Sequence, residues 1–130
     1  MNVIQKIDKT VEFLKSKIDY VPEIAIILGS GLGKLADLIE DAKIIPYEEI
    51  PNFPRTTVAG HEGKLIFGTI KNRRVVAMKG RFHYYEGNEM DSVVYPIRVF
   101  RRLGIGNLIV TNAAGGINTG FKPGDLMLIT

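Results

Sequence analysis

A continuous apolar run that ends in a cluster of glycines is the feature that most constrains the fold of this chain. Residues 24–28 read IAIIL and lead directly into GSGLG at 29–33. An unbroken apolar run bounded by chain breakers is typical of a strand buried on both faces of a sheet. Apolar residues then recur at helical spacing between Leu32 and Ile39, which predicts a helix. A strand, a glycine turn and a helix in this order open a parallel α/β unit.

The rest of the chain continues the pattern of an α/β domain. Apolar residues at helical spacing predict an amphipathic helix over about the first eighteen residues. Three prolines between 46 and 54 predict an extended, irregular loop. Two strands joined by a polar turn at 71–73 are predicted next, followed by a helix in which Pro96 marks a kink or a late start. The ranges are 64–70 and 74–78 for these strands, 88–103 for the helix, and 108–111 and 126–130 for two further strands, the first of them buried.

The chain contains no internal repeat, low-complexity tract or linker, so we expect a single α/β region over residues 1–130. Because the chain ends within the last predicted strand, we also expect further protein to follow it. The absence of cysteine excludes a disulfide scaffold, a thiolate metal site and a cysteine nucleophile.

Charge and hydropathy argue against two classes of partner, nucleic acids and membranes. The net charge is +3 and no run of lysine or arginine exceeds two residues, so no nucleic-acid partner is expected. Residues 103–121 carry no charge, but their asparagines and glycines argue against a lipid-facing helix. Lys6 and Asp8 interrupt the N-terminal segment where a targeting signal would be apolar. We therefore expect a soluble, cytoplasmic protein without a membrane partner.

The glycines gather in three loops, each after a predicted strand. The loops read GSGLG at 29–33, GRFHYYEG at 80–87 and NAAGG at 112–116. Ligands of open parallel sheets bind at the carboxyl ends of the strands, so the three loops are expected to meet at one crevice.

The first loop has the chemistry of an anion site. Its glycines let backbone N–H groups approach a ligand, the following helix presents its positive end, and Ser30 adds a hydroxyl. Neither the phosphate-loop spacing nor the dinucleotide fingerprint is matched, however. A tight turn without a ligand remains the alternative.

The second loop supplies the charge. Arg81 can grip a phosphate through two hydrogen bonds and His83 can donate to the same anion. Phe82, Tyr84 and Tyr85 offer ring faces for a sugar or a base, the alternative being a surface turn whose aromatic residues pack into the core.

The third loop lacks side-chain bulk at Ala113, Ala114, Gly115 and Gly116, so a flat or anionic ligand can lie against its backbone. A tightly packed junction is the alternative there. His61, in a turn flanked by glycines, has both a structural and a functional interpretation. No HExxH or paired-carboxylate spacing occurs, so no metal site is predicted.

Four segments together carry a family resemblance. They read ILGSGLG at 27–33, EIPNFPRTTVAGHEGKLIFG at 49–68, GRFHYYEG at 80–87 and VTNAAGGIN at 110–118. In this order and spacing they resemble the trimeric purine nucleoside phosphorylases, over the whole chain but only the first half of a typical member. The resemblance implies a phosphorylase/hydrolase-like three-layer α/β fold, with a central mixed, twisted sheet flanked by helices, here incomplete. It also implies a homotrimer.

The resemblance further implies reversible phosphorolysis of purine (deoxy)ribonucleosides to free base and pentose 1-phosphate. Inorganic phosphate is then the co-substrate, and no cofactor is needed because positioning and electrostatics carry such a reaction. The matching positions imply phosphate binding by Ser30, Arg81, His83, His61 and the Ala113 N–H, catalytic roles for His83 and His61, ribose packing by Tyr85, and base contacts by Ala114 and Gly115.

The family's purine-recognising glutamate, its base-contacting asparagine, a histidine near the ribose hydroxyl and an aromatic residue from a neighbouring subunit lie in the half that is absent here. We therefore expect this chain alone to be inactive. The alternative function is a non-catalytic phosphate- or nucleotide-binding α/β module, and an RNA-binding protein is a third. Nucleoside hydrolysis differs from phosphorolysis in needing no phosphate.

Overall fold

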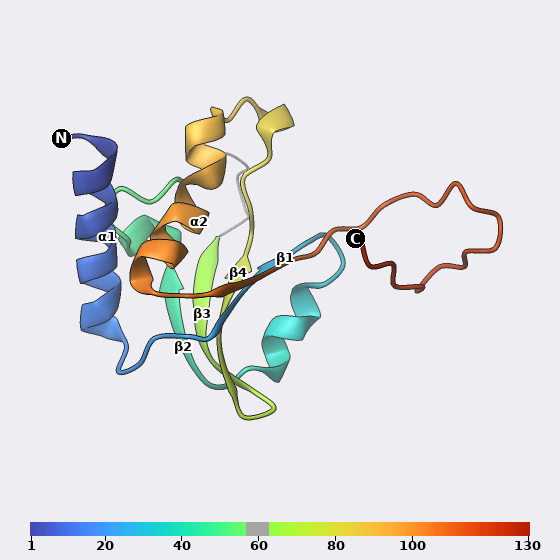
Figure 1. Cartoon of the computed structure of the whole chain (residues 1–130), viewed down its shortest axis with the longest axis horizontal. Coiled ribbons are helices and arrows are strands. Elements are labelled where there is room, and N and C mark those ends of the chain that lie inside the picture. The colour runs from blue at the N-terminus through green and yellow to red at the C-terminus, as the bar shows by residue number, and fades with distance from the viewer. Residues whose placement is uncertain (57–62) are drawn as a thin grey trace.

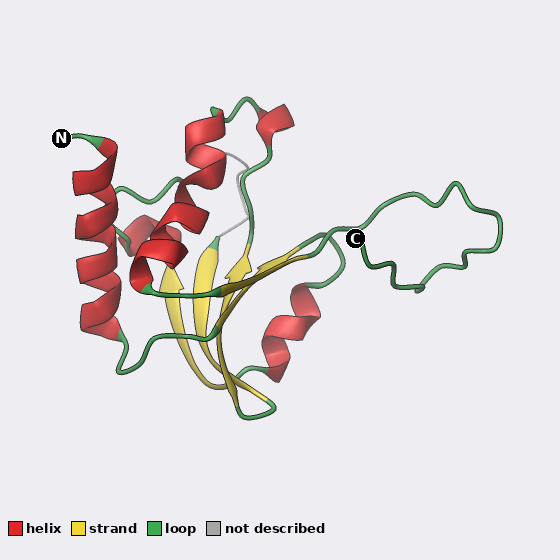
Figure 2. Cartoon of the chain, viewed as in Figure 1, coloured by secondary structure: helices red, strands yellow, loops and turns green. Residues whose placement is uncertain are grey.

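The computed structural model describes residues 1–56 and 63–130, and in these a five-stranded sheet organises the chain (Figures 1 and 2). The α-helices are α1 (Val3–Lys17) and α2 (Met90–Leu103); the strands are β1 (Ile24–Leu28), β2 (Glu40–Pro46), β3 (Lys64–Ile70), β4 (Arg73–Lys79) and β5 (Asn107–Val110); and the 3-10 helices are η1 (Gly33–Leu38), η2 (Tyr47–Glu49) and η3 (Tyr84–Glu86).

The strand order is β2-β3-β4-β1-β5. β1 runs parallel to both β4 and β5, whereas β2, β3 and β4 pair antiparallel. The predicted β3–β4 hairpin forms because Lys71 and Asn72 adopt positive φ angles of 47° and 64°, as a two-residue type I′ turn requires. The sheet is therefore mixed, as the resemblance implied.

Helices cover both faces of this sheet (Figure 1). On one face, Leu14 of α1 and Val99 of α2 share a hydrophobic cluster with Phe67 of β3. On the other face η1 brings Ala36 against Ile66 and its neighbours. These layers confirm the expected helix–sheet–helix arrangement.

Sequence signals mark the start of α1 and the end of α2. α1 begins at a capping box, in which the Asn2 side chain accepts from the Gln5 N–H at 2.9 Å and the Gln5 side chain accepts from the Asn2 N–H at 3.0 Å. α2 ends at Gly104, whose φ is 108°. Pro96 lies inside α2 and is fully buried in the core. No helix in the described part of the chain is long and apolar enough to cross a membrane.

In the segment between residues 32 and 54, one prediction was wrong in part and one strand was missed. The element after the glycines is the 3-10 helix η1 rather than an α-helix. The predicted irregular loop is preceded by strand β2, which ends at Pro46. β2 escaped prediction because its first five residues are exposed at the sheet edge and show no apolar alternation.

Two predictions for the C-terminal region were also wrong. β5 was expected to be buried, but Leu108, Ile109 and Val110 are 44–59% exposed, because β5 lies at the sheet edge and its side chains join neither core cluster of the described residues. Residues 126–130 form no strand and belong to the projecting segment that follows β5 (Figure 1).

The exposed C-terminal region leaves the chain with an unusually large surface. Its accessible area is 8997 Å². A compact protein of 14.4 kDa is expected to expose about 6,800 Å². Apolar side chains from β5 onward contribute to the difference, among them Ile117 at 98% and Leu126 at 94% exposure.

Candidate functional site

The three predicted loops begin at the same end of the sheet, because β4, β1 and β5 are adjacent and parallel. Thr111, directly after β5, is hydrogen-bonded to residues at the ends of β1 and β4. Its hydroxyl accepts from the Gly29 N–H at 2.9 Å and donates to the Ile27 carbonyl at 2.8 Å. Its carbonyl accepts from the Arg81 guanidinium at 3.0 Å. One residue thus joins the ends of all three strands.

Gly29 makes this approach possible. A Cβ at this position would overlap the Thr111 carbonyl oxygen and the Asn112 Cα, both of which are backbone atoms that cannot rotate away. The glycine after β1 is therefore required for packing whether or not a ligand binds.

We expect Gly29→Ala to lower the free energy of unfolding by about 1–3 kcal/mol, because the ends of β1 and β5 must separate. Urea denaturation followed by circular dichroism measures the change. Gly106→Ala is the matched control, since a Cβ there meets no atom within 4 Å. Equal stability of the two variants would contradict the packing role of Gly29.

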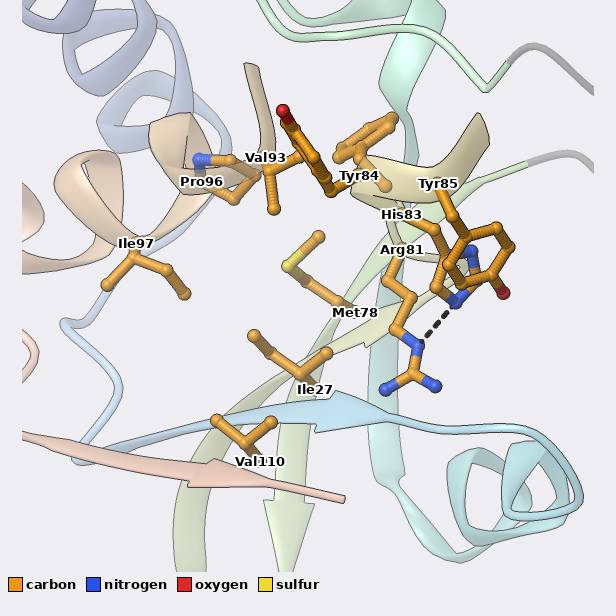
Figure 3. A pocket seen from close by; sticks show the side chains of 11 residues that line it. Ile27, Met78, Arg81, His83, Tyr84, Tyr85, Val93, Pro96, Ile97 and Val110 are labelled. Atoms are coloured by element: carbon orange, nitrogen blue, oxygen red, sulfur yellow. Dashed lines mark hydrogen bonds between the residues drawn. The ribbon is translucent and has the colours of Figure 1, made fainter. Parts of the chain in front are cut away.

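Arg81 and His83 face one another beside Thr111 (Figure 3). Arg81 Nε donates to His83 Nε2 at 2.9 Å, so Nε2 is the acceptor in this contact. Nδ1 lies 3.3 Å from a Glu86 carboxylate oxygen. An anion placed between the two side chains would accept hydrogen bonds from the Arg81 guanidinium and lie beside the His83 ring.

The aromatic residues of this loop divide between the surface and the core. Tyr85 stacks on His83 with ring centroids 4.6 Å apart and is 81% exposed, and Tyr84 is exposed as well. Phe82 is buried and packs against Tyr47, as the alternative of core packing predicted, and it also lines the cavity described next. Its apolar side chain turns inward while its polar neighbours face the loop surface.

A cavity of about 340 Å³ lies beside these side chains (Figure 3). Arg81, His83, Tyr84 and Tyr85 line one part of it; Ile27, Met78, Val93, Pro96, Ile97 and Val110 give it an apolar wall, and Phe82 completes the lining. Its volume falls in the lower range of small-molecule pockets, and a few polar groups against an apolar wall are typical of them.

The other predicted site residues that the structure describes lie outside this cavity. Ser30 is exposed at the turn after β1. Ala113, Ala114 and Gly115 are exposed in the projecting segment, and a Cβ on Gly115 would meet no atom within 4 Å. His61 lies outside the described residues. The structure thus brings Arg81 and His83 together and leaves the other assignments as predictions.

Sequence reasoning missed two residues at this site. The sequence could have indicated Thr111, since this residue ends a predicted strand directly before the third loop. No sequence pattern indicated Tyr47, because tertiary contacts alone bring it to the site. Its side chain is buried, its hydroxyl donates to the Gly80 carbonyl, and burial raises the pKa of the phenol well above its usual value. The hydroxyl therefore stays protonated and remains a donor.

No group of three or more His, Cys, Asp or Glu side chains within residues 1–56 and 63–130 is placed to hold a metal ion.

The family model described as Phosphorylase superfamily matches residues 23–130. The chain belongs to this superfamily. It is 56% identical over 124 residues to purine nucleoside phosphorylase 1 of Geobacillus stearothermophilus, covering 95% of this chain and 45% of that enzyme. It is 50% identical over 122 residues to the purine nucleoside phosphorylase of Mus musculus, covering 94% of this chain and 42% of the mouse enzyme.

Solved structures of purine nucleoside phosphorylases are also similar to this member of the superfamily. A crystal structure of a purine nucleoside phosphorylase in complex with ribose-1-phosphate is 52% identical, with a TM-score of 0.89 over 96% of this chain and 46% of that one. The Schistosoma mansoni enzyme in complex with inosine is 51% identical, with a TM-score of 0.87 over 96% of this chain and 44% of that one. The predicted resemblance and the fold class are confirmed, and the chain spans less than half the length of these relatives.

Proposed function

We propose that this chain forms the phosphate-binding part of a purine nucleoside phosphorylase, a pentosyltransferase. The observation that carries the proposal is the Arg81–His83 pair at the carboxyl ends of three parallel strands, beside a cavity with an apolar wall. Support comes from the relative of the same fold at 52% identity, whose structure contains ribose-1-phosphate.

In the proposed reaction a phosphate oxygen forms a bond to the anomeric carbon of a purine (deoxy)ribonucleoside. The glycosidic bond breaks, its electron pair leaves with the purine, and the purine nitrogen takes up a proton. The products are the free base and (deoxy)ribose 1-phosphate. No protein nucleophile takes part, so the chain must hold the phosphate and stabilise the charges that develop.

The site residues have separate tasks in this proposal. Arg81 and His83 hold the phosphate through charge-assisted hydrogen bonds, and the Ser30 hydroxyl adds a third donor. His61 stands beside the phosphate, and the exposed ring of Tyr85 packs on the ribose.

Three further roles involve the projecting segment. We propose that the Ala113 N–H binds phosphate and that Ala114 and Gly115 line the purine. These residues are exposed and do not line the cavity, so the segment would have to turn toward it.

The wider setting is part of the same proposal. Inorganic phosphate is the co-substrate and no other cofactor takes part. The complete enzyme is a homotrimer that acts in the cytoplasm in purine salvage. We further propose that this chain alone is inactive, since it spans 46% or less of the relatives described above and Ala113–Gly115 lie away from the cavity.

The isolated chain tests this proposal in two measurements. Inorganic phosphate, titrated into ¹⁵N-labelled protein, is expected to shift the Arg81 and His83 signals saturably. Inosine with phosphate is expected to give no hypoxanthine. Absence of phosphate-dependent shifts would contradict the phosphate site, and rapid hypoxanthine release would contradict the inactivity of the chain alone.

A further inference from the structure

One buried tyrosine contacts the chain on both sides of Arg81. Tyr47, the first residue of η2, is 3% exposed. Its hydroxyl donates to the carbonyl of Gly80, the residue before Arg81. Its ring packs against Phe82, the residue after Arg81, with ring centroids 5.5 Å apart. The backbone that carries Arg81 is thus held at both neighbouring residues by one side chain.

The surroundings of Tyr47 are shaped to fit its ring. Its backbone N–H donates to the Gly63 carbonyl at 3.0 Å, and a Cβ on Gly63 would overlap the Tyr47 ring. Gly80 has a φ of 97°, a conformation that favours glycine, and its carbonyl accepts from the tyrosine hydroxyl. Phe53 closes the cluster with a ring centroid 4.9 Å from that of Tyr47. A residue that served only to fill the core would need no hydroxyl here, whereas the Tyr47 hydroxyl has the Gly80 carbonyl as its partner.

Arg81 needs such support because its side chain is long. The guanidinium reaches both His83 Nε2 and the Thr111 carbonyl, and its position depends on the direction in which the backbone projects it. A binding group that is already fixed in place loses less conformational entropy when the ligand arrives.

We propose that Tyr47 is a positioning residue for phosphate: it fixes Gly80 and Phe82 and thereby holds the Arg81 guanidinium between His83 and Thr111. This inference rests on the proposed function, since it takes Arg81 as the phosphate ligand. Tyr47 itself touches no substrate in the proposal and acts through Arg81.

The test compares Tyr47→Phe with Tyr95→Phe in the 130-residue chain. Tyr95 is the matched control because it is also buried near Phe53, and its hydroxyl is hydrogen-bonded to the Thr10 hydroxyl at 2.8 Å, away from Gly80. Each variant removes one buried phenol hydroxyl and keeps the ring. Two NMR measurements follow: the Arg81 Nε–H signal, and the dissociation constant of inorganic phosphate from amide shifts at Arg81 and His83.

Tyr47→Phe is expected to move the Arg81 Nε–H signal toward that of an unpaired arginine and to raise the phosphate dissociation constant about fivefold, a change of about 1 kcal/mol. Tyr95→Phe is expected to leave both at wild-type values, although it lowers the melting temperature. If Tyr47→Phe lowers only the melting temperature, Tyr47 is a structural residue and the proposal is overturned. If the wild-type chain shows no phosphate-dependent shift, the proposed function fails, while the Nε–H signal still decides whether Tyr47 positions Arg81.

Discussion

Arg81→Ala is expected to weaken phosphate binding by about tenfold or more. The substitution removes a charge-assisted hydrogen bond, which contributes roughly 1.5–3 kcal/mol, and a factor of ten corresponds to about 1.4 kcal/mol. It also releases His83 Nε2 and the Thr111 carbonyl from their contacts with the guanidinium, so the site loses order as well as charge. Titration of inorganic phosphate followed by NMR or calorimetry measures the effect.

Two further substitutions separate charge from geometry. Arg73→Ala removes the same charge at an exposed position paired with Glu23, away from the three loops, and is expected to leave phosphate affinity unchanged. Arg81→Lys keeps the charge but loses the planar fork, so an intermediate affinity is expected. A titration curve for Arg81→Ala that coincides with the wild-type curve would remove Arg81 from the site.

Much of the fold could be predicted because the local sequence pattern of most elements matches the burial or turn geometry that these elements have in the structure. The apolar run at Ile24–Leu28 and the hairpin around Lys71 and Asn72 carry their structure in a few adjacent residues. β2 lacks that agreement, since its residues from Glu40 to Ile44 are exposed at an edge and its register shifts between Glu40 and Lys43. Edge strands are paired on one side only, so their sequences carry a weaker pattern.

The candidate site also contains residues that the sequence could place and contacts that it could not. Arg81 and His83 follow a predicted strand directly, so the sequence places them at the sheet end. The contact between Tyr47 and Gly80 joins residues far apart in the chain, and the fold alone brings them together. The burial of β5 was predicted wrongly for a related reason: an apolar run indicates that a strand can be covered, but tertiary structure decides what covers it.

The exposed surface around β5 points to where another polypeptide segment would bind. β5 leaves one edge unpaired, and its apolar side chains are exposed, a combination that favours pairing with another chain. The purine nucleoside phosphorylases described above contain more than twice the matched length, with the same fold over the shared part. A polypeptide equivalent to their remaining part is the partner that this surface is expected to accept.

Co-expression tests that expectation together with the enzymatic proposal. We expect this chain to co-purify with the part of the Geobacillus stearothermophilus enzyme that it does not span. The complex is expected to release hypoxanthine from inosine only when phosphate is present, whereas either piece alone releases none. Phosphate-independent release would indicate hydrolysis, and a complex that binds phosphate without turnover would favour the non-catalytic module.

A pair of lysine substitutions locates the contact. Ile109→Lys places a charge on β5, where the isoleucine is 48% exposed, and is expected to abolish both co-purification and hypoxanthine release. Ile4→Lys, at a 62% exposed position on α1, is the matched control and is expected to retain both, because α1 lies on the far side of α2 from β5 (Figure 1). Co-purification of the Ile109→Lys variant at the wild-type level would show that the partner binds elsewhere, and the exposed apolar strand would then have no part in assembling the enzyme.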